Sequence, residues 1–350
     1  MDLITGGAGF IGSHLVAALR GAGVEVRVLE RPGADVEHLG DGVELVRADI
    51  RDRAAMVRAT RGCRHVYHLA ADPNLWRRDW RAYDAINHQG ALNVIRAALD
   101  NGAERVLHTS TESILTTADG VDDPVEQREL RESDMLGPYC LSKFRADSAV
   151  RQLAATGAPV ILVCPTLPVG PGDRSLTPPT RMSLAFCRGE LPAYLNCRLN
   201  LVDARDVAAG MIAAMRRGRP GRRYLLGGHN RELADWLATL GAQLGRPAPR
   251  WTVPYAVALA VAWCSETWAT YVTGEVPMAT VTGVRLTRRS MFFDPSASQA
   301  ELGFAPRPVD ESARDAVDWY RALGWLGAQG PTTQAISARR LRYGQPWNLS

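Results

Sequence analysis

The stretch from Leu3 to His14 reads Leu-Ile-Thr-Gly-Gly-Ala-Gly-Phe-Ile-Gly-Ser-His, and the architecture of the chain follows from it. A short apolar run ends at the glycines, and an apolar pattern of helical period begins among them. Glycine permits the tight turn, lets a pyrophosphate approach main-chain N–H groups at the positive end of the helix dipole, and lets the helix pack closely on the strand. We therefore predict a strand, a dinucleotide-binding turn and a helix. The predicted cofactor contacts in this stretch are Gly6, Gly9, Phe10, Ile11 and Gly12.

Length and composition indicate a globular protein with a large core. The chain has 350 residues, and 46% of them are hydrophobic, which suffices for one large or two modest domains. The 41 basic and 37 acidic residues are spread along the chain without a long run of either sign. This is not the charge pattern of a nucleic-acid-binding protein, so we expect no nucleic-acid partner.

The cysteines and histidines indicate neither disulfides nor a metal site. Six cysteines show no CxxC pair, which is typical of free thiols in a reducing compartment. The seven histidines lack metal-ligand spacing. The amino terminus leads directly into the first strand, so no signal peptide is expected. We predict a cytoplasmic protein without a bound metal.

Apolar strands alternate with helical patterns through the first third of the chain. The expected strands are Val24 to Glu30, Val43 to Val46, Val66 to Leu69 and Arg105 to Thr109, and the expected helices are Arg53 to Thr60 and Asn87 to Leu99. Such alternation predicts the α/β class, with a doubly wound parallel sheet of the Rossmann type. Its ligand crevice lies beyond the carboxyl ends of the strands. The residues expected to converge there with the glycine turn are Glu30, Asp49, Ala70 and the run from Thr109 to Glu112.

Glu30 ends the predicted second strand, shortly after the glycine turn. An acidic residue at this place accepts hydrogen bonds from the adenosine ribose hydroxyls and repels a 2′-phosphate, which favours NAD. The neighbouring Arg31 could instead stack on adenine or bind a 2′-phosphate. NAD is therefore the predicted cofactor, and NADP stays open as an alternative.

Tyr139 and Lys143 lie four positions apart, so on a helix they would share one face. An ammonium near a phenol favours the phenolate, which brings a pKa of about 10 towards the range useful for proton exchange with an alcohol or ketone. Lys143 can also bind the nicotinamide ribose, and the hydroxyl of Thr111 can steady the substrate oxygen. A Tyr-x-x-x-Lys pair alone is common on solvated helices. Following a dinucleotide-binding turn, it predicts a catalytic set.

The most hydrophobic segment runs from Tyr255 to Cys264. It is shorter than the roughly 20 residues that a transmembrane helix needs, so no membrane span is expected. We predict a buried helix here. The alternative is a surface that meets a lipid or an apolar substrate. The residues that would form this surface are Ala256, Ala258, Ala260, Trp263, Trp268 and Tyr271.

Taken together, these residues give a sequence that resembles the extended short-chain dehydrogenases/reductases of the NAD-dependent epimerase/dehydratase superfamily. The resemblance covers residues 1 to 323. Its motifs are TGGAGFIG at 5 to 12, Asp49, HLAA at 68 to 71, Asn87, the Thr–Tyr–Lys set, Pro165 with VGPGD at 169 to 173, and DARDVAAG at 203 to 210. The chain is most similar to the dihydroflavonol-reductase-like branch and to hopanoid-associated sugar epimerases, in segments 64–76, 189–210, 224–230 and 283–293.

The resemblance implies hydride transfer between a nicotinamide and a carbon that bears a hydroxyl or carbonyl group. Tyr139 would be the general acid/base, Lys143 its electrostatic partner and Thr111 the hydroxyl that orients the substrate. Besides Tyr139 and Lys143, the implied cofactor residues are Asp49, Ile50, Leu69, Ala70, Ala71, Asn87, Thr109 and Pro165. Asn87 has a structural or proton-relay role in the family. Members pair through two helices beside the sheet, so we expect a homodimer.

The resemblance also implies two lobes and an extension. Residues 1–165 and 206–228 would form the dinucleotide-binding domain, and residues 166–205 and 229–325 a smaller C-terminal lobe that holds the substrate. Residues 326–350 would be an extension without a counterpart in the family. By family position, the substrate pocket would include Trp76, Arg77, Arg78, Trp80 and Tyr194.

Two departures from the family pattern bear on the reaction. Nucleotide-sugar epimerases carry an arginine that grips the nucleotide where this chain has Leu199, with Arg198 one position away. The expected substrate is therefore a sugar-like, polyol or lipid-linked alcohol or ketone without a nucleotide. Glu112 stands where dehydratases of the superfamily have an acidic residue. It could be a second acid/base or a polar residue at the edge of the cleft.

Three functions follow from these observations. The first is an NAD(P)-dependent oxidoreductase or epimerase that uses Thr111, Tyr139 and Lys143. The second is a dehydratase that recycles its NAD and uses Glu112. The third is a regulatory protein that senses NAD(P) without chemistry, against which the presence of both Tyr139 and Lys143 argues. We expect an enzyme of the first kind with a small-molecule substrate.

Overall fold

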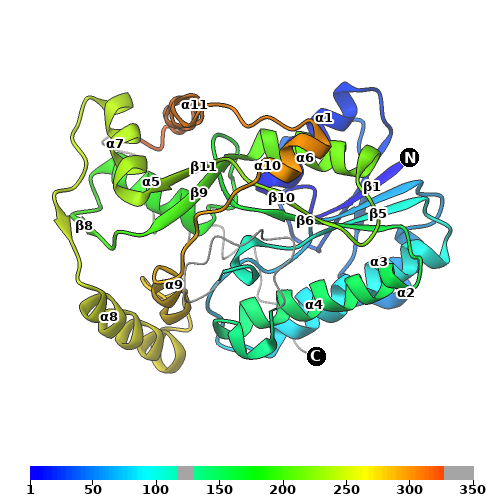
Figure 1. Ribbon diagram of the computed structural model, residues 1–350, viewed down its shortest axis with the longest axis horizontal. Helices are drawn as coiled ribbons and strands as arrows, with labels where there is room; N and C mark the ends of the chain where they lie inside the picture. The colour runs from blue at the N-terminus through cyan, green and yellow to red at the C-terminus, as the bar shows by residue number, and fades with distance from the viewer. Residues whose placement is uncertain (117–129, 327–350) are drawn as a thin grey trace.

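The chain folds around a seven-stranded parallel sheet in the order β10-β6-β5-β4-β1-β2-β3 (Figure 1). The computed structural model describes residues 1–116 and 130–326, so almost all of the predicted extension lies outside the described residues. The strands are β1 (Asp2–Thr5), β2 (Val26–Glu30), β3 (Glu44–Arg47), β4 (His65–His68), β5 (Arg105–Thr109), β6 (Val160–Pro165) and β10 (Arg223–Leu226). The predicted Rossmann-type sheet is confirmed. Its order reverses between β1 and β4, which is where such sheets bind their ligands.

Helices cover both faces of this sheet (Figure 1). They are α1 (Phe10–Gly21) and α6 (Ala204–Arg217) on one face, and α2 (Arg53–Ala59), α3 (Ala91–Asp100) and α4 (Gly137–Ala155) on the other. On the first face Leu15 and Met211 are buried in one apolar cluster. On the second, Met56 and Ile95 are buried in another. Because both faces are covered, strand β6 reads Val-Ile-Leu-Val-Cys-Pro, and all six of its residues are buried.

The turn after β1 depends on close contacts that only glycine permits. Gly6 has a φ of +73°, and a Cβ there would lie 2.8 Å from the main-chain nitrogen of Ala70. A Cβ on Gly12 would lie 2.2 Å from the carbonyl oxygen of Gly6. Helix α1 therefore begins directly against the end of β1. Gly9 precedes α1 and provides no side-chain cap, so the first N–H groups of the helix are suited to binding an anion.

A second group of elements lies outside the seven-stranded sheet. Its first strand, β7, begins two residues after the end of β6. This group contains a three-stranded sheet in the order β11-β9-β7 and a two-stranded sheet of β8 and β12. Its strands are β7 (Leu167–Val169), β8 (Ala193–Tyr194), β9 (Arg198–Asp203), β11 (His229–Glu232) and β12 (Trp251–Thr252). The remaining helices are α5 (Pro178–Arg188), α7 (Leu233–Leu244), α8 (Tyr255–Trp268), α9 (Val281–Leu286), α10 (Ser296–Leu302) and α11 (Val309–Ala322). Trp236 and Tyr320 are buried in the core that α5, α7 and α11 share.

Helix α8 is exposed, so the prediction of a buried helix was wrong. Ala262 is its one buried residue, and the side chains of Trp263 and Trp268 are 66% and 63% exposed. The helix packs on α9 and lies at the edge of the molecule (Figure 1). Among the described residues, no helix has both the length and the apolar character needed to cross a membrane.

Replacing Gly12 with alanine tests the contact between α1 and the turn. The new Cβ would lie 2.2 Å from the Gly6 carbonyl oxygen, so we expect Gly12→Ala to lower the free energy of unfolding by about 2–4 kcal/mol. Gly21→Ala is the matched control, since a Cβ at this last residue of α1 meets nothing within 4 Å. It should leave stability unchanged or raise it by up to about 1 kcal/mol. Denaturant unfolding measures both, and equal stability of Gly12→Ala and wild type would contradict the prediction.

Candidate active site

Three predicted catalytic side chains meet at the carboxyl end of β5. Thr111 precedes the short helix η3 (Glu112–Ile114), and Tyr139 and Lys143 are one turn apart on α4. The Thr111 side chain lies close enough to the Tyr139 phenol to favour its ionised form. The Nζ atom of Lys143 donates to the carbonyl oxygen of Thr109 at 2.7 Å. The structure thus gathers a hydroxyl, a phenol and an ammonium group, which together can bind and protonate an oxygen atom.

The electrostatics of Tyr139 differ from the expectation. Burial raises the pKa of the phenol above its usual range, and the Glu112 carboxylate raises it further. Lys143 is itself desolvated, and burial lowers the pKa of its ammonium group to about 8. The expected lowering of the Tyr139 pKa is therefore not found, because the net shift is upward. Desolvation of the phenol is the largest cause, and the Lys143 ammonium is bound to the Thr109 carbonyl.

Glu112 is buried next to the catalytic set. Its Oε2 accepts a hydrogen bond from the Thr111 hydroxyl at 2.9 Å, and its Oε1 accepts one from the Ser113 hydroxyl at 3.5 Å. Burial raises the pKa of Glu112 to about 7, an effect that these hydrogen bonds only partly oppose. A carboxyl group that titrates near neutral pH is suited to giving and taking protons.

Asn87 fixes the segment after β4 against α4. It lies in the π-helical segment η2 (Asp84–Gly90). Its Oδ1 accepts from the main-chain nitrogen of Asp72 at 2.7 Å, and its Nδ2 donates to the Ser142 hydroxyl at 3.2 Å. The buried Asp72 carboxylate pairs with Arg77. Sequence analysis missed Asp72 and Ser142, although an acidic residue directly after the HLAA motif was an available signal.

Two stacked histidines lie on the strands beneath Lys143. The rings of His68 and His108 are 5.5 Å apart, and the Nδ1 of His68 is 2.8 Å from the Thr5 hydroxyl. Burial and the charge of Lys143 lower both pKa values, that of His68 to about 3. Both rings are therefore neutral and add no charge that would compete with the ammonium. Sequence analysis missed His108, because only the register of β4 and β5 places it opposite His68.

The glycine turn and the segment after β4 form one side of the predicted cofactor site. The main-chain nitrogens of Leu69 and Ala70 donate to the carbonyl and hydroxyl oxygens of Thr5, at 3.1 and 3.2 Å. Ala71 follows them on the same segment, which lies against Gly6. Behind the turn, the side chains of the helix residues Phe10 and Ile11 are buried and partly buried.

The acidic residues after β2 and β3 are engaged differently. Glu30 ends β2, and its Oε1 accepts from the main-chain nitrogen of Ala8 at 2.7 Å, which ties the carboxylate to the glycine turn. Burial raises the pKa of Glu30, and the charge of Arg31 opposes this. Asp49 instead pairs with Arg51 at 2.7 Å. Ile50 is buried in the core, so it supports the site rather than lining it.

Three buried hydroxyl groups at the ends of β5 and β6 have no hydrogen-bond partner among the described residues. They are those of Thr109, at the end of β5, of Ser110, which follows it, and of Thr166, directly after Pro165 at the end of β6. A buried hydroxyl normally makes a hydrogen bond, so these three are suited to a ligand. The residues present therefore fit an extended dinucleotide, with its pyrophosphate on the glycine turn and its other end beside these hydroxyls.

The predicted substrate-pocket residues are dispersed. Arg77 pairs with Asp72 beside the catalytic set, and Trp76 is half-buried in the same loop. Trp80 is 57% exposed, Arg78 is also exposed, and Tyr194 lies on β8 in the smaller group of elements. Of these residues, Arg77 is tied to the catalytic set, because its partner Asp72 contributes to the pKa of Tyr139.

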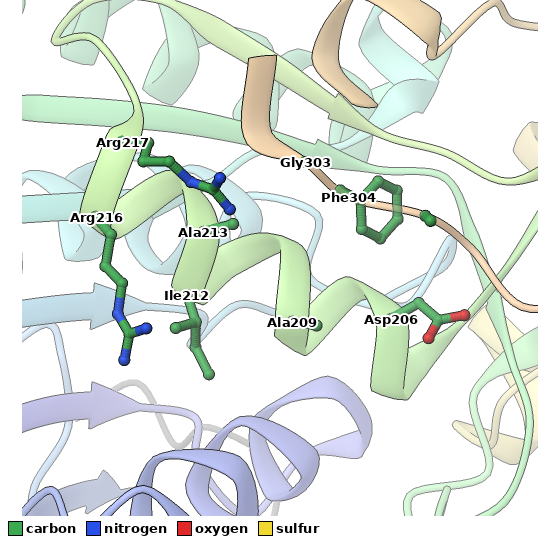
Figure 2. Close-up of a pocket in the computed structure, with 9 residues that line it drawn as sticks. Asp206, Ala209, Ile212, Ala213, Arg216, Arg217, Gly303 and Phe304 are labelled. Atoms are coloured by element: carbon green, nitrogen blue, oxygen red, sulfur yellow. The ribbon is translucent and has the colours of Figure 1, made fainter. Parts of the chain in front are cut away.

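A hollow of about 400 Å³ lies elsewhere, along α6 (Figure 2). Its lining includes Asp206, Arg216 and Phe304, and Asp206 is already paired with Arg307 at 2.7 Å. The hollow contains none of the predicted site residues. Among the described residues, no group of three or more metal-ligating side chains gathers.

Comparisons with known proteins identify similar chains. Residues 3–227 match the sequence model of the NAD dependent epimerase/dehydratase family. The chain is 33% identical to a putative dihydroflavonol 4-reductase of Synechocystis sp., over 93% of this chain and 96% of that one. It is 30% identical to sterol demethylase protein B of Methylococcus capsulatus, over 93% and 99%. The crystal structure of gox2253 matches with a TM-score of 0.82 and 34% identity, over 93% of this chain and 99% of that one.

Substitution of Glu30 tests its contact with the cofactor. Glu30→Ala removes a buried carboxylate that can accept from ribose hydroxyls, and a hydrogen bond to a charged group contributes about 1.5–3 kcal/mol. We expect the NAD dissociation constant to rise by about tenfold or more, while NADP binding is unchanged or improved. Glu44→Ala on β3 is the control, because this exposed carboxylate pairs with Arg27 and should not affect either nucleotide. Fluorescence titration measures both affinities, and tighter binding of NADP than of NAD by the wild type would contradict the assignment.

The raised pKa of Glu112 predicts a pH-dependent stability. Its pKa is 4.5 when exposed and about 7 in the folded protein, so folding favours the protonated form. The resulting stability is complete below the lower value and is lost as the pH rises through the upper one. Between about pH 5 and pH 8 the wild type should lose up to about 3 kcal/mol more unfolding free energy than Glu112→Gln, which stays neutral. Urea unfolding across this pH range measures the difference, and parallel curves would show that Glu112 is not the titrating group.

Proposed function

Because the chain belongs to the NAD-dependent epimerase/dehydratase family and is an enzyme that uses NAD, we propose that it moves a hydride and a proton at a secondary alcohol or ketone. The meeting of Thr111, Tyr139 and Lys143 at the end of β5 carries this proposal. The large sheet holds the cofactor, and the smaller C-terminal lobe holds the substrate. Both groups of elements would line the active site, because Thr282 of α9 lies against Gly137 at the start of α4, the helix that carries Tyr139.

The chemistry divides between the cofactor and three side chains. NAD, when bound, supplies the group that accepts or gives the hydride. Tyr139 gives its phenolic proton to a carbonyl oxygen, or takes the proton of a hydroxyl group in the reverse direction. Thr111 holds that same oxygen by a hydrogen bond, and the ammonium of Lys143 stabilises the phenolate. The raised pKa of Tyr139 keeps the phenol protonated before reaction, which suits the direction of reduction.

The substrate is a ring-borne or lipid-linked alcohol or ketone without a nucleotide. The position for a nucleotide-gripping arginine holds Leu199 on β9, and the guanidinium of Arg198 lies 5.3 Å from the Phe292 ring centre. Stacking on an aromatic ring leaves Arg198 engaged with the protein itself.

A second candidate, a dehydratase, is favoured by one observation. Glu112 is buried 2.9 Å from the Thr111 hydroxyl, and its pKa is about 7. It could therefore take a proton from the carbon next to an oxidised centre, after which hydroxide leaves with a proton as water. The hydride would then return to the substrate, so NAD would be recycled without net reduction.

Removal of the phenolic oxygen of Tyr139 tests the proposal. With a panel of sugar, polyol and alicyclic lipid alcohols and ketones, Tyr139→Phe should lower kcat by about 10²- to 10⁴-fold and leave NAD binding nearly unchanged. Tyr83→Phe is the matched control, because the Tyr83 ring packs 6.3 Å from that of Tyr139 while its own oxygen bonds to the Asn74 carbonyl. Turnover by Tyr139→Phe at the wild-type rate would refute the role of the phenol. Net change in nicotinamide absorbance during product formation identifies an oxidoreductase, and its absence an epimerase or dehydratase.

A further inference from the structure

Helix α8 and the segment η6 (Ala269–Thr273) that continues it present an apolar surface to the outside. We define the α8 face as Val257, Val261, Trp263, Trp268, Tyr271 and Val272, all of which are exposed. Tyr271 is 80% exposed, and a single exposed aromatic residue would need no explanation. Six large apolar side chains on adjoining helical turns are a continuous patch, and such patches mark interaction sites.

Exposed arginines lie on the elements next to this face. Arg288 lies with its guanidinium 3.7 Å from the centre of the Tyr255 ring, at the start of α8. The guanidinium of Arg78 lies near Gly274 at the end of η6, 3.7 Å from where a Cβ on that glycine would stand. Arg250 precedes the exposed Trp251 of β12. The exposed basic residues on the surrounding elements are Arg78, Arg81, Arg250, Arg285 and Arg288.

The acidic groups of the same elements do not balance this charge. They are Asp79, Glu266 and Glu275. Glu266 faces α9, where its Oε1 accepts from the main-chain nitrogen of Val281 at 2.7 Å. Asp79 is half-buried and accepts from the main-chain nitrogen of Arg81 at 3.1 Å. Of the three, only Glu275 is exposed, so the surroundings of the α8 face are net positive.

Exposed tryptophan, tyrosine and valine residues, with arginines on the adjoining elements, match the interface of an anionic lipid bilayer. Aromatic rings favour the depth of the lipid headgroups, and arginines are attracted to the negative surface. Docking at the surface is the relevant mode of contact, because no helix among the described residues is long and apolar enough to cross a membrane. A second copy of the chain fits this face less well than a bilayer does. Two-fold pairing through α8 would place these arginines opposite the same arginines of the other copy, and the like charges would repel.

We propose that the α8 face docks this enzyme on anionic membrane surfaces, so that a lipid-borne alcohol or ketone reaches Tyr139 without crossing water. The proposal rests on the proposed function for its substrate. Helix α8 is connected to the active site through α9. It packs on α9, and Thr282 of α9 lies against Gly137, two residues before Tyr139.

Sedimentation of the full-length protein with vesicles tests this docking. We expect binding to vesicles of equimolar phosphatidylcholine and phosphatidylglycerol and much weaker binding to phosphatidylcholine alone. The variant Trp263→Ser/Trp268→Ser/Tyr271→Ser should bind the anionic vesicles at least about tenfold more weakly. Arg250→Gln/Arg288→Gln should lose most of the preference for anionic lipid. Leu45→Ser is the control, because this exposed apolar residue lies on β3, at the far edge of the sheet.

Two results would overturn the proposal. The first is equal vesicle binding by the wild type and the triple variant. The second is absence of vesicle binding by the wild type, whether or not it self-associates through α8 or captures a protein there instead. NAD affinity and thermal unfolding are measured on the same samples, so loss of binding by misfolding is recognised. Vesicle binding by a protein that fails to bind NAD would refute the proposed function while leaving the docking surface in place.

Discussion

The structure depends on one close backbone contact, between the start of α1 and the turn that follows β1. At Gly12 even a methyl group would overlap the carbonyl oxygen of Gly6, so the helix can approach the sheet only because both residues lack side chains. This approach directs the first N–H groups of α1 across the carboxyl ends of the strands. It also sets Gly6 against the segment after β4. The two segments thereby fix the position of the crevice at the centre of the sheet.

Burial, more than charge pairing, sets the chemistry around that crevice. Tyr139 and Glu112 are pushed towards their protonated forms, and Lys143 towards its neutral form, by the same loss of solvent. The neutral pair His68 and His108 keeps the layer beneath Lys143 free of further positive charge. The phenol of Tyr139 and the carboxyl group of Glu112 therefore tend to keep their protons. A positively charged ligand nearby would lower the pKa of the phenol and favour the phenolate.

The two groups of elements differ in the surface that they expose as well as in their part in the site. The central sheet is covered by helices on both faces, whereas α8 rests on α9 and exposes its tryptophans. The exposure is not required by the fold, because the core shared by α5, α7 and α11 is complete without α8. An apolar surface that the core does not use is best explained by an external partner, which connects this surface to the apolar class of substrate that we propose.

The sequence by itself determined the sheet, the glycine turn and the placement of the catalytic set. Local signals suffice for these: the strand at Val26–Glu30 lies in an apolar-rich segment that ends in an acidic residue, and the pair Tyr139 and Lys143 needs only helical spacing to share a face. Tertiary structure alone decided the pKa of Tyr139, the pairing of His68 with His108 and the exposure of α8. Each of these depends on which distant segments surround a side chain, and desolvation or its absence is a property of that surrounding volume, not of residues adjacent in sequence.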